Sequence, residues 1–134
     1  MIQTIKSGNK VLALIFTKIK ADGVKFLVPK SYPLQVGLVE NNRGKRMVKA
    51  HKHRNHRYDV RTTQEFIYVE RGNAIVVIYD DDFNEMAVFD LKAGDFMLSV
   101  AGGHAFSIEK GSRLIEVKQG PYPGDKRAKV FKED

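Results

Sequence analysis

Four side chains of this 134-residue chain have the chemistry to bind a divalent metal. His51 and His53 are separated by one residue, and Glu65 and His104 follow downstream. On a β-strand, side chains two residues apart point to the same face, so the two imidazoles would lie together. Three imidazoles and one carboxylate suit zinc, iron, manganese, nickel or cobalt and leave coordination positions for water or a substrate. The residue types therefore favour a metal site.

Simpler interpretations of the same residues remain open. A His-x-His pair in a basic strand is also typical of a solvated surface. Glu65 could be a structural carboxylate that pairs with Arg46 or Arg61.

Positive charge is concentrated beside the His-x-His pair. The chain has 23 Lys and Arg against 16 Asp and Glu, a formal net charge of +7. Eight basic residues and one acid lie between Arg43 and Arg61, so this segment accounts for the whole excess. Such a cluster beside a site indicates a small anionic ligand. The predicted ligand contacts are Lys49, Lys52, Arg54, Arg57 and Arg61.

The elements that must position these residues are predicted to be β-strands. Short runs rich in β-branched and aromatic residues alternate with turn residues at a spacing near ten, which is typical of an all-β sandwich or barrel. No apolar stripe of helical period is long enough to predict a helix. The predicted strands are Val11–Lys18, Val24–Val28, Leu34–Glu40, Arg46–His53, Gln64–Glu70, Ala74–Tyr79, Glu85–Leu91, Asp95–Val100, His104–Glu109 and Arg113–Lys118.

Alternation along two of these strands predicts which side chains share a face. Met47, Lys49, His51 and His53 would lie on one face of the strand Arg46–His53. In the strand Gln64–Glu70, one face would point inward and the other outward. The inward set is Glu65, Ile67 and Val69, and the outward set is Phe66, Tyr68 and Glu70.

The spacing of these motifs resembles that of the cupins, a family of small jelly-roll β-barrels. His51-x-His53 matches the histidine pair of the family's first motif, and six residues separate Glu65 from Gly72, as in that motif. Gly94 begins the second motif, which reaches His104 through Gly102-Gly103. The resemblance implies a single cupin domain over residues 1–134, with its motifs at about 44–118 and a C-terminal strap at 119–134. It also implies a divalent metal held by His51, His53, Glu65 and His104.

The chain departs from the cupin pattern between its ligand strands. Eleven residues separate His53 from Glu65, where the family has three or four, so residues 54–63 form a basic insertion. His56 lies in that insertion and could replace a ligand. Neither Ser107 nor Ile108 is the asparagine that usually follows the last histidine.

The sequence is compatible with three classes of function. The resemblance implies an isomerase- or epimerase-like protein of bacterial carbohydrate or polysaccharide metabolism, in which a sugar phosphate or nucleotide-sugar meets Glu65 and His104 as catalytic acid and base. The alternative is a non-catalytic sugar- or carboxylate-binding module of the same fold. A basic domain that binds nucleic acid or an acidic protein is less favoured, because Tyr58 is the only aromatic residue in the basic segment.

Composition and the remaining motifs bear on the cellular compartment, the oligomeric state and calcium binding. The chain has no cysteine, and its longest apolar run, Val11–Phe16, is too short to cross a bilayer, so we expect a cytoplasmic protein without a membrane partner. The same run is a candidate dimer contact, and we expect a homodimer. Asp80-x-Asp82-x-Asn84 imitates a calcium loop but lacks its glycine and glutamate, which predicts a hairpin turn instead.

Overall fold

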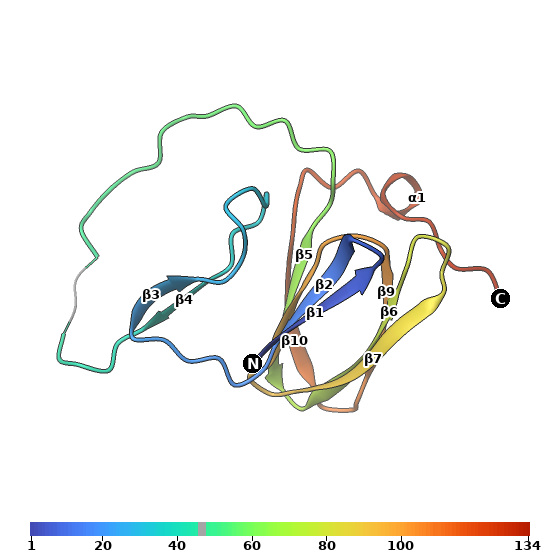
Figure 1. The fold of residues 1–134 in the computed structure, drawn as a ribbon, viewed down its shortest axis with the longest axis horizontal. Helices are drawn as coiled ribbons and strands as arrows, with labels where there is room; N and C mark the ends of the chain where they lie inside the picture. Colours follow the sequence, from blue (N-terminus) through green and yellow to red (C-terminus); the bar gives the residue numbers. More distant parts are fainter. Residues whose placement is uncertain (46–47) are drawn as a thin grey trace. The chain divides into compact units, whose positions relative to one another are not determined.

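The computed structural model describes residues 1–45 and 48–134, and nearly all of its regular structure is β-strand (Figure 1). The all-β prediction is therefore confirmed. The chain forms two compact units. Unit 1 comprises Met1–Lys18 and Thr62–Asp134, and unit 2 comprises Ile19–Arg61.

The larger sheet of unit 1 has five antiparallel strands in the order β1-β2-β8-β5-β10. Its central strands are the most apolar, because both faces of the sheet are covered there. All side chains from Leu12 to Phe16 are at most 7% exposed. The strands are β1 (Ile2–Ser7), β2 (Lys10–Phe16), β8 (Phe96–Ser99), β5 (Glu65–Arg71) and β10 (Arg113–Lys118).

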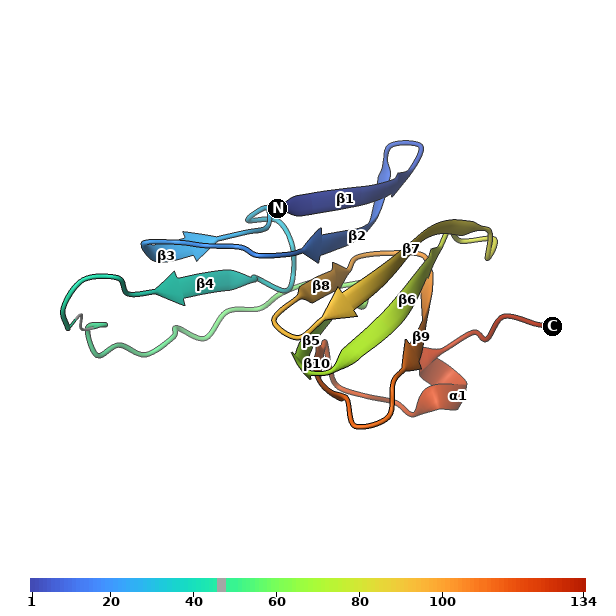
Figure 2. The same cartoon turned by 90° about the horizontal axis from the view of Figure 1, so that it is seen from below.

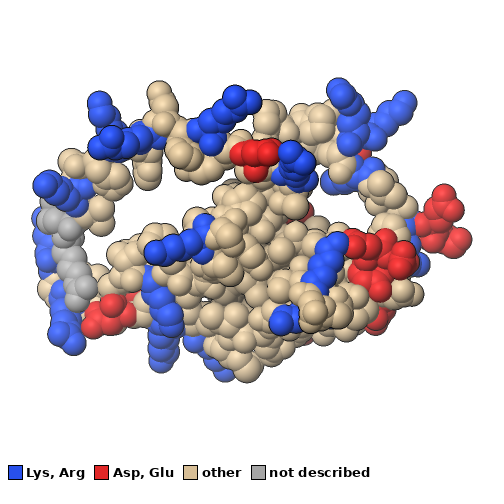
Figure 3. Space-filling model, turned by 45° about the horizontal axis from the view of Figure 1, so that its top comes forward, with Lys and Arg blue, Asp and Glu red and all other residues tan. Residues whose placement is uncertain are grey.

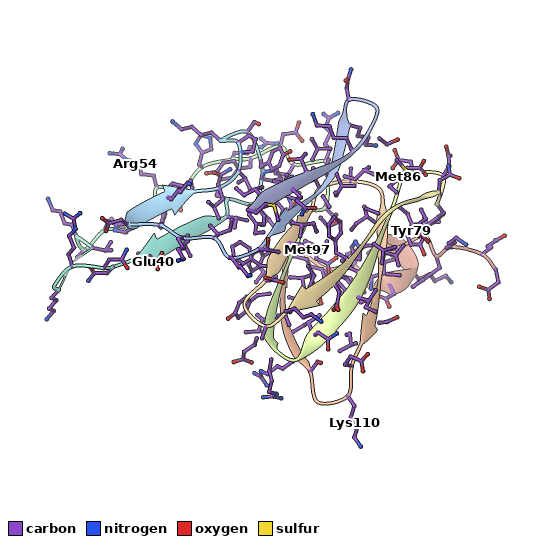
Figure 4. The ribbon with its side chains drawn as sticks, turned by 60° about the horizontal axis from the view of Figure 1, so that its bottom comes forward. Glu40, Arg54, Tyr79, Met86, Met97 and Lys110 are labelled. Carbon is purple, nitrogen blue, oxygen red and sulfur yellow. The ribbon has the colours of Figure 1, made fainter. Side chains whose placement is uncertain are left out.

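A second sheet of three strands lies against the first, in the order β7-β6-β9 (Figure 2). These strands are β7 (Glu85–Lys92), β6 (Asn73–Tyr79) and β9 (Gly103–Ile108). Ile67 and Met97 of the larger sheet form one buried cluster with Val76 and Ile78 of the smaller one (Figure 4, where Met97 is labelled). The described strands of unit 1 thus form a sandwich of two separate sheets and no closed barrel.

The predicted inward face of the strand that begins at Gln64 is confirmed. Ile67 and Val69 are 4% and 0% exposed, and Glu65 is half-buried on the same face. The hairpin turn between β6 and β7 is also confirmed. There, Asp80 Oδ1 accepts hydrogen bonds of 2.9 Å from the backbone N–H groups of Asp82 and Asn84.

Other local predictions are corrected. The strand expected at Arg46–His53 is absent from residues 48–53, and Arg46 and Met47 lie outside the described residues. A strand needs a partner, and the described residues 48–61 are all exposed and form neither strand nor helix. The sequence also failed to predict β1 and the four-residue helix α1 (Asp125–Ala128).

The candidate dimer contact Val11–Phe16 lies inside the larger sheet of unit 1. This run forms most of β2, which is hydrogen-bonded to β1 on one side and to β8 on the other. Its apolar side chains are buried within the chain and leave little surface for a partner. The homodimer itself stays a prediction.

Unit 2 contains an antiparallel hairpin of β3 (Gly23–Phe26) and β4 (Gly37–Glu40). The Ala21 N–H group donates a 2.6 Å hydrogen bond to Glu40 Oε2, which ties the start of the hairpin to its end. Apolar side chains remain exposed on both strands, since Phe26 is 67% and Val39 is 68% exposed. Within the described ranges, no helix is long and apolar enough to span a membrane.

Candidate functional site

Three side chains form a hydrogen-bonded array at the inner faces of the two sheets in unit 1. His104 Nε2 lies 3.2 Å from Glu65 Oε2, and His104 Nδ1 lies 3.2 Å from Ser99 Oγ. Glu65 and Ser99 come from the five-stranded sheet and His104 from the three-stranded sheet. The array therefore joins the two layers of the sandwich.

Strand register explains why Glu65 and Ser99 are neighbours. They are directly opposed residues of β5 and β8, and directly opposed side chains of an antiparallel pair lie on the same face. Ile67 and Met97 are opposed in the same way two residues along. The face that carries Glu65 is thus the face that forms the hydrophobic core.

A glycine turn brings His104 to the same place. Gly102 has a positive φ of 67°, and a Cβ atom at this position would lie 2.2 Å from the carbonyl oxygen of Tyr79. Only glycine fits this close approach. The short turn lets β9 begin at Gly103, so that His104 points back toward Ser99 at the end of β8.

Burial and electrostatics act in opposite directions on Glu65. Burial by itself raises the pKa of the Glu65 carboxyl group, because desolvation disfavours the charged form. The hydrogen bond and charge of His104 lower it, and the positive charges of Lys118 and Lys129 add to that effect. The resulting pKa lies below the ordinary value for glutamate, so Glu65 is an anion at neutral pH.

The ionised carboxylate of Glu65 determines which ring nitrogen of His104 carries a proton. An ionised carboxylate can only accept hydrogen bonds, so Nε2 of His104 must carry the proton. When the imidazole is neutral, Nδ1 then accepts a hydrogen bond from the Ser99 hydroxyl group. The array can take up a proton at Nδ1, with Glu65 stabilising the imidazolium that forms.

The C-terminal residues beside Glu65 were not predicted as part of a site. Lys118 is directly opposite Glu65 in the β10–β5 pair, and its Nζ atom lies 3.0 Å from Glu116 Oε1. The same Nζ atom lies 5.3 Å from the centroid of the Tyr122 ring. Lys118 ended a predicted strand, but its neighbourhood depends on which strand pairs with which, and the sequence alone did not give that pairing.

The other predicted ligands lie in unit 2. His51 and His53 are exposed, and their ring centroids are 5.3 Å apart in an edge-on arrangement. His51 Nδ1 lies 2.8 Å from the carbonyl oxygen of Lys49. His56, the possible substitute ligand, is exposed beside Tyr58, with ring centroids 4.8 Å apart.

The structure therefore groups the four predicted ligands as two pairs in two units. Glu65 and His104 are in contact in unit 1, and His51 and His53 are neighbours in unit 2. Within residues 1–45 and 48–134, no group of three or more His, Cys, Asp or Glu residues is arranged to hold a metal ion.

The five predicted anion contacts lie in unit 2, as His51 and His53 do. All five are exposed. In Figure 3, the Lys and Arg side chains (blue) are distributed around the whole view and do not form a single patch. Arg61 pairs with Asp59 at 3.2 Å. Glu65 pairs with His104 and not with Arg61, and Arg46, its other suggested partner, lies outside the described residues. The five predicted anion contacts are Lys49, Lys52, Arg54, Arg57 and Arg61.

Comparison of the chain with models of protein families, with curated proteins and with solved structures gave no match.

Proposed function

We propose that this protein is a cupin-type enzyme that moves a proton on a small anionic molecule, such as a sugar phosphate or a nucleotide-sugar, in an isomerase- or epimerase-like reaction. The observation that carries the proposal is the array of Ser99, His104 and Glu65, with distances of 3.2 Å at both ring nitrogens. Catalytic proton transfer needs a group that changes charge near neutral pH and a partner that stabilises its charged form.

His104 and Glu65 have complementary roles in this proposal. Neutral His104 accepts the substrate proton at Nδ1, and the carboxylate of Glu65 stabilises the imidazolium through Nε2. The protonated ring then returns the proton to the substrate, which completes an isomerisation or epimerisation without net consumption of acid or base. The His104 side chain is 23% exposed, so the ring is not sealed from a ligand.

The residue types also support a divalent metal; in the metal-bound form the ion would take the place of the Nε2 proton of His104, and Glu65 would act as a ligand. Imidazole and carboxylate groups suit zinc, iron, manganese, nickel or cobalt. The 3.2 Å between His104 Nε2 and Glu65 Oε2 is close to the roughly 3 Å expected between adjacent ligands of one ion, given metal–ligand distances of about 2.1 Å. In unit 1, Glu65 and His104 would hold the ion, which when bound would polarise a substrate oxygen. His51 and His53 of unit 2 stay predicted ligands. In unit 2, Lys49, Lys52, Arg54, Arg57 and Arg61 stay the anion contacts that the sequence predicts.

Deuterium incorporation tests the proton-transfer proposal. A panel of sugar phosphates and nucleotide-sugars is incubated with the protein in D₂O, and ¹H NMR follows loss of signal at carbons next to a carbonyl group. We expect incorporation with at least one compound, and a reduction of roughly 100-fold or more in His104→Ala, since general acid–base groups contribute about 10² to 10⁴ in rate. His56→Ala is the matched control and should keep the full rate. Equal rates in His104→Ala and wild type would contradict the assignment.

Elemental analysis of tag-free protein, purified without chelator, tests the metal. We expect one equivalent of a divalent metal in the wild type, and loss of it in His51→Ala and in His104→Ala. His56→Ala should retain the metal, and loss of the metal in this variant would identify His56 as a ligand. Full metal content in both His51→Ala and His104→Ala would show that the ligands are wrongly assigned, and wild-type protein without metal would contradict the metal proposal.

A further inference from the structure

The chain that follows β10 begins directly beside the array of Ser99, His104 and Glu65. Lys118 is the last residue of β10 and lies opposite Glu65 in the strand register. The next residue is tied to β5 by two hydrogen bonds. The Gln64 N–H group donates to Gln119 Oε1 at 2.5 Å, and the Gln119 N–H group donates to the Gln64 carbonyl at 3.2 Å. Residues 118 and 119 are thus fixed against the strand that carries Glu65.

The Lys118 ammonium group is held near Glu65 with hydrogen-bonding capacity to spare. Because directly opposed residues of an antiparallel pair share a face, Lys118 lies on the same face as Glu65. Glu116 and the ring of Tyr122 fix the position of Nζ. An ammonium group has three donors, and Glu116 uses one of them. The Lys118 side chain is only 26% exposed, and partial burial strengthens its interaction with an anion.

A second lysine follows α1. Lys129 Nζ lies 3.3 Å from Asp125 Oδ1, and the positive charge of Lys129 acts on the Glu65 carboxylate. From Lys118 to Lys129 there are four basic residues and one acid, so this segment has a net charge of +3. The basic residues are Lys118, Lys126, Arg127 and Lys129, and the acid is Asp125.

We propose that Lys118, assisted by Lys129, binds the carboxylate or phosphate group of the ligand on which Glu65 and His104 act. This inference rests on the proposed function for its catalytic pair, but it places the anion contacts in the C-terminal segment of unit 1. Tyr122 keeps the Lys118 ammonium group oriented for that contact. The bound anion would lie beside the imidazole, where the proton is transferred.

Anion titrations followed by NMR test this inference. Inorganic phosphate and acetate are each added at constant pH and constant ionic strength, with chloride as the balancing ion, and the imidazole ¹H–¹³C resonances of all four histidines are recorded. We expect a saturable shift of the His104 resonances. The probe that binds more tightly identifies the ligand group as phosphate or carboxylate.

Lysine variants identify the residues that bind the phosphate or acetate probe. Lys118→Gln should weaken binding by about 10-fold or more, because a hydrogen bond to a charged group contributes about 1.5–3 kcal/mol. Lys118→Arg should retain binding within a few-fold, and Lys129→Gln should weaken it less than Lys118→Gln does. Lys110→Gln is the matched control, because Lys110 is an exposed lysine in the turn before β10.

Three outcomes would overturn the inference. They are an absence of any saturable shift at His104, equal weakening by Lys110→Gln and Lys118→Gln, and shifts at His51, His53 and His56 in place of His104. The last outcome would assign the anion contacts to the basic segment of unit 2. Phosphate or acetate binding at Lys118 without deuterium exchange on any sugar substrate would support this inference while contradicting the proposed reaction, so the two failures are distinguishable.

Discussion

The two pairs of predicted metal ligands differ in what holds them. Glu65 and His104 lie on strands that are hydrogen-bonded within two sheets, and a defined register brings their side chains to 3.2 Å. His51 and His53 lie in an exposed segment without a strand, where their rings contact one another and His51 Nδ1 contacts the Lys49 carbonyl oxygen. Alternation of side chains places a residue in space only when its strand has a partner. The predicted inward face at Glu65 is therefore confirmed, and the strand predicted around His51 is absent from the described residues 48–53.

Amide hydrogen exchange should show the largest contrast between these regions. We expect the amide of Val76, in the central strand of its sheet, to exchange at least about 1,000-fold more slowly than the amides of residues 49–57. Exchange of a core amide requires opening that costs up to the global free energy of unfolding, of order 5–15 kcal/mol. Mass spectrometry or NMR would measure both rates. Comparable protection from exchange in residues 49–57 would support the strand that the sequence predicts at Arg46–His53.

Two phenylalanines offer a matched test of the same contrast in stability. Phe16 in β2 is 0% exposed, and its ring stacks on Phe96 with centroids 4.9 Å apart. Phe26 in β3 is 67% exposed. Phe16→Ala should lower the free energy of unfolding by about 3–5 kcal/mol, because it opens a cavity in the core. Phe26→Ala should change it by no more than about 0.5 kcal/mol.

Chemical denaturation of both variants would measure this difference. Both variants replace phenylalanine with alanine in a β-strand. Differences in β-propensity and side-chain size therefore do not contribute to the difference in unfolding free energy. Similar losses in Phe16→Ala and Phe26→Ala would mean that the hairpin of unit 2 is as tightly packed as the sandwich of unit 1.

The strands of unit 1 were largely predictable because local pattern and tertiary packing agree there. The run Gln64–Glu70 is rich in β-branched and aromatic residues, and the observed β5 buries Ile67 and Val69 on the predicted inward face. β1 was missed because its apolar residues, Ile2 and Ile5, are not spaced by two, and a bulge follows Ile5. The pattern of a single edge strand is weak without knowledge of its partner.

The site was predicted only in part for a related reason. Glu65 and His104 were identified from motif spacing, and their contact is present. Ser99 and Lys118 carried no motif, and they belong to the site because β8 and β10 both pair with β5. That pairing joins residues up to 53 positions apart in the chain, such as Glu65 and Lys118. Periodicity within one strand contains no information about such distant partners.

Removal of the charge at position 65 should have the smallest of these effects, and its pH dependence is the informative part. Glu65→Gln should destabilise the protein by about 1–2 kcal/mol at pH 7, because a charge-assisted hydrogen bond to His104 becomes a neutral one. Glu85→Gln, at an exposed position of β7, is the control and should have little effect.

The sign of the pH dependence follows from the lowered pKa of Glu65. Burial opposes ionisation, but the hydrogen bond to His104 and the nearby positive charges outweigh it, so the folded protein holds the carboxylate at lower pH than the unfolded chain does. The stabilisation by Glu65 is therefore present above the ordinary glutamate pKa and is lost as the pH falls through the lowered pKa of the folded state. The stability difference between wild type and Glu65→Gln should shrink in urea unfolding curves as the pH falls below the ordinary glutamate pKa. A difference that grew over that same pH range would contradict the lowered pKa of Glu65.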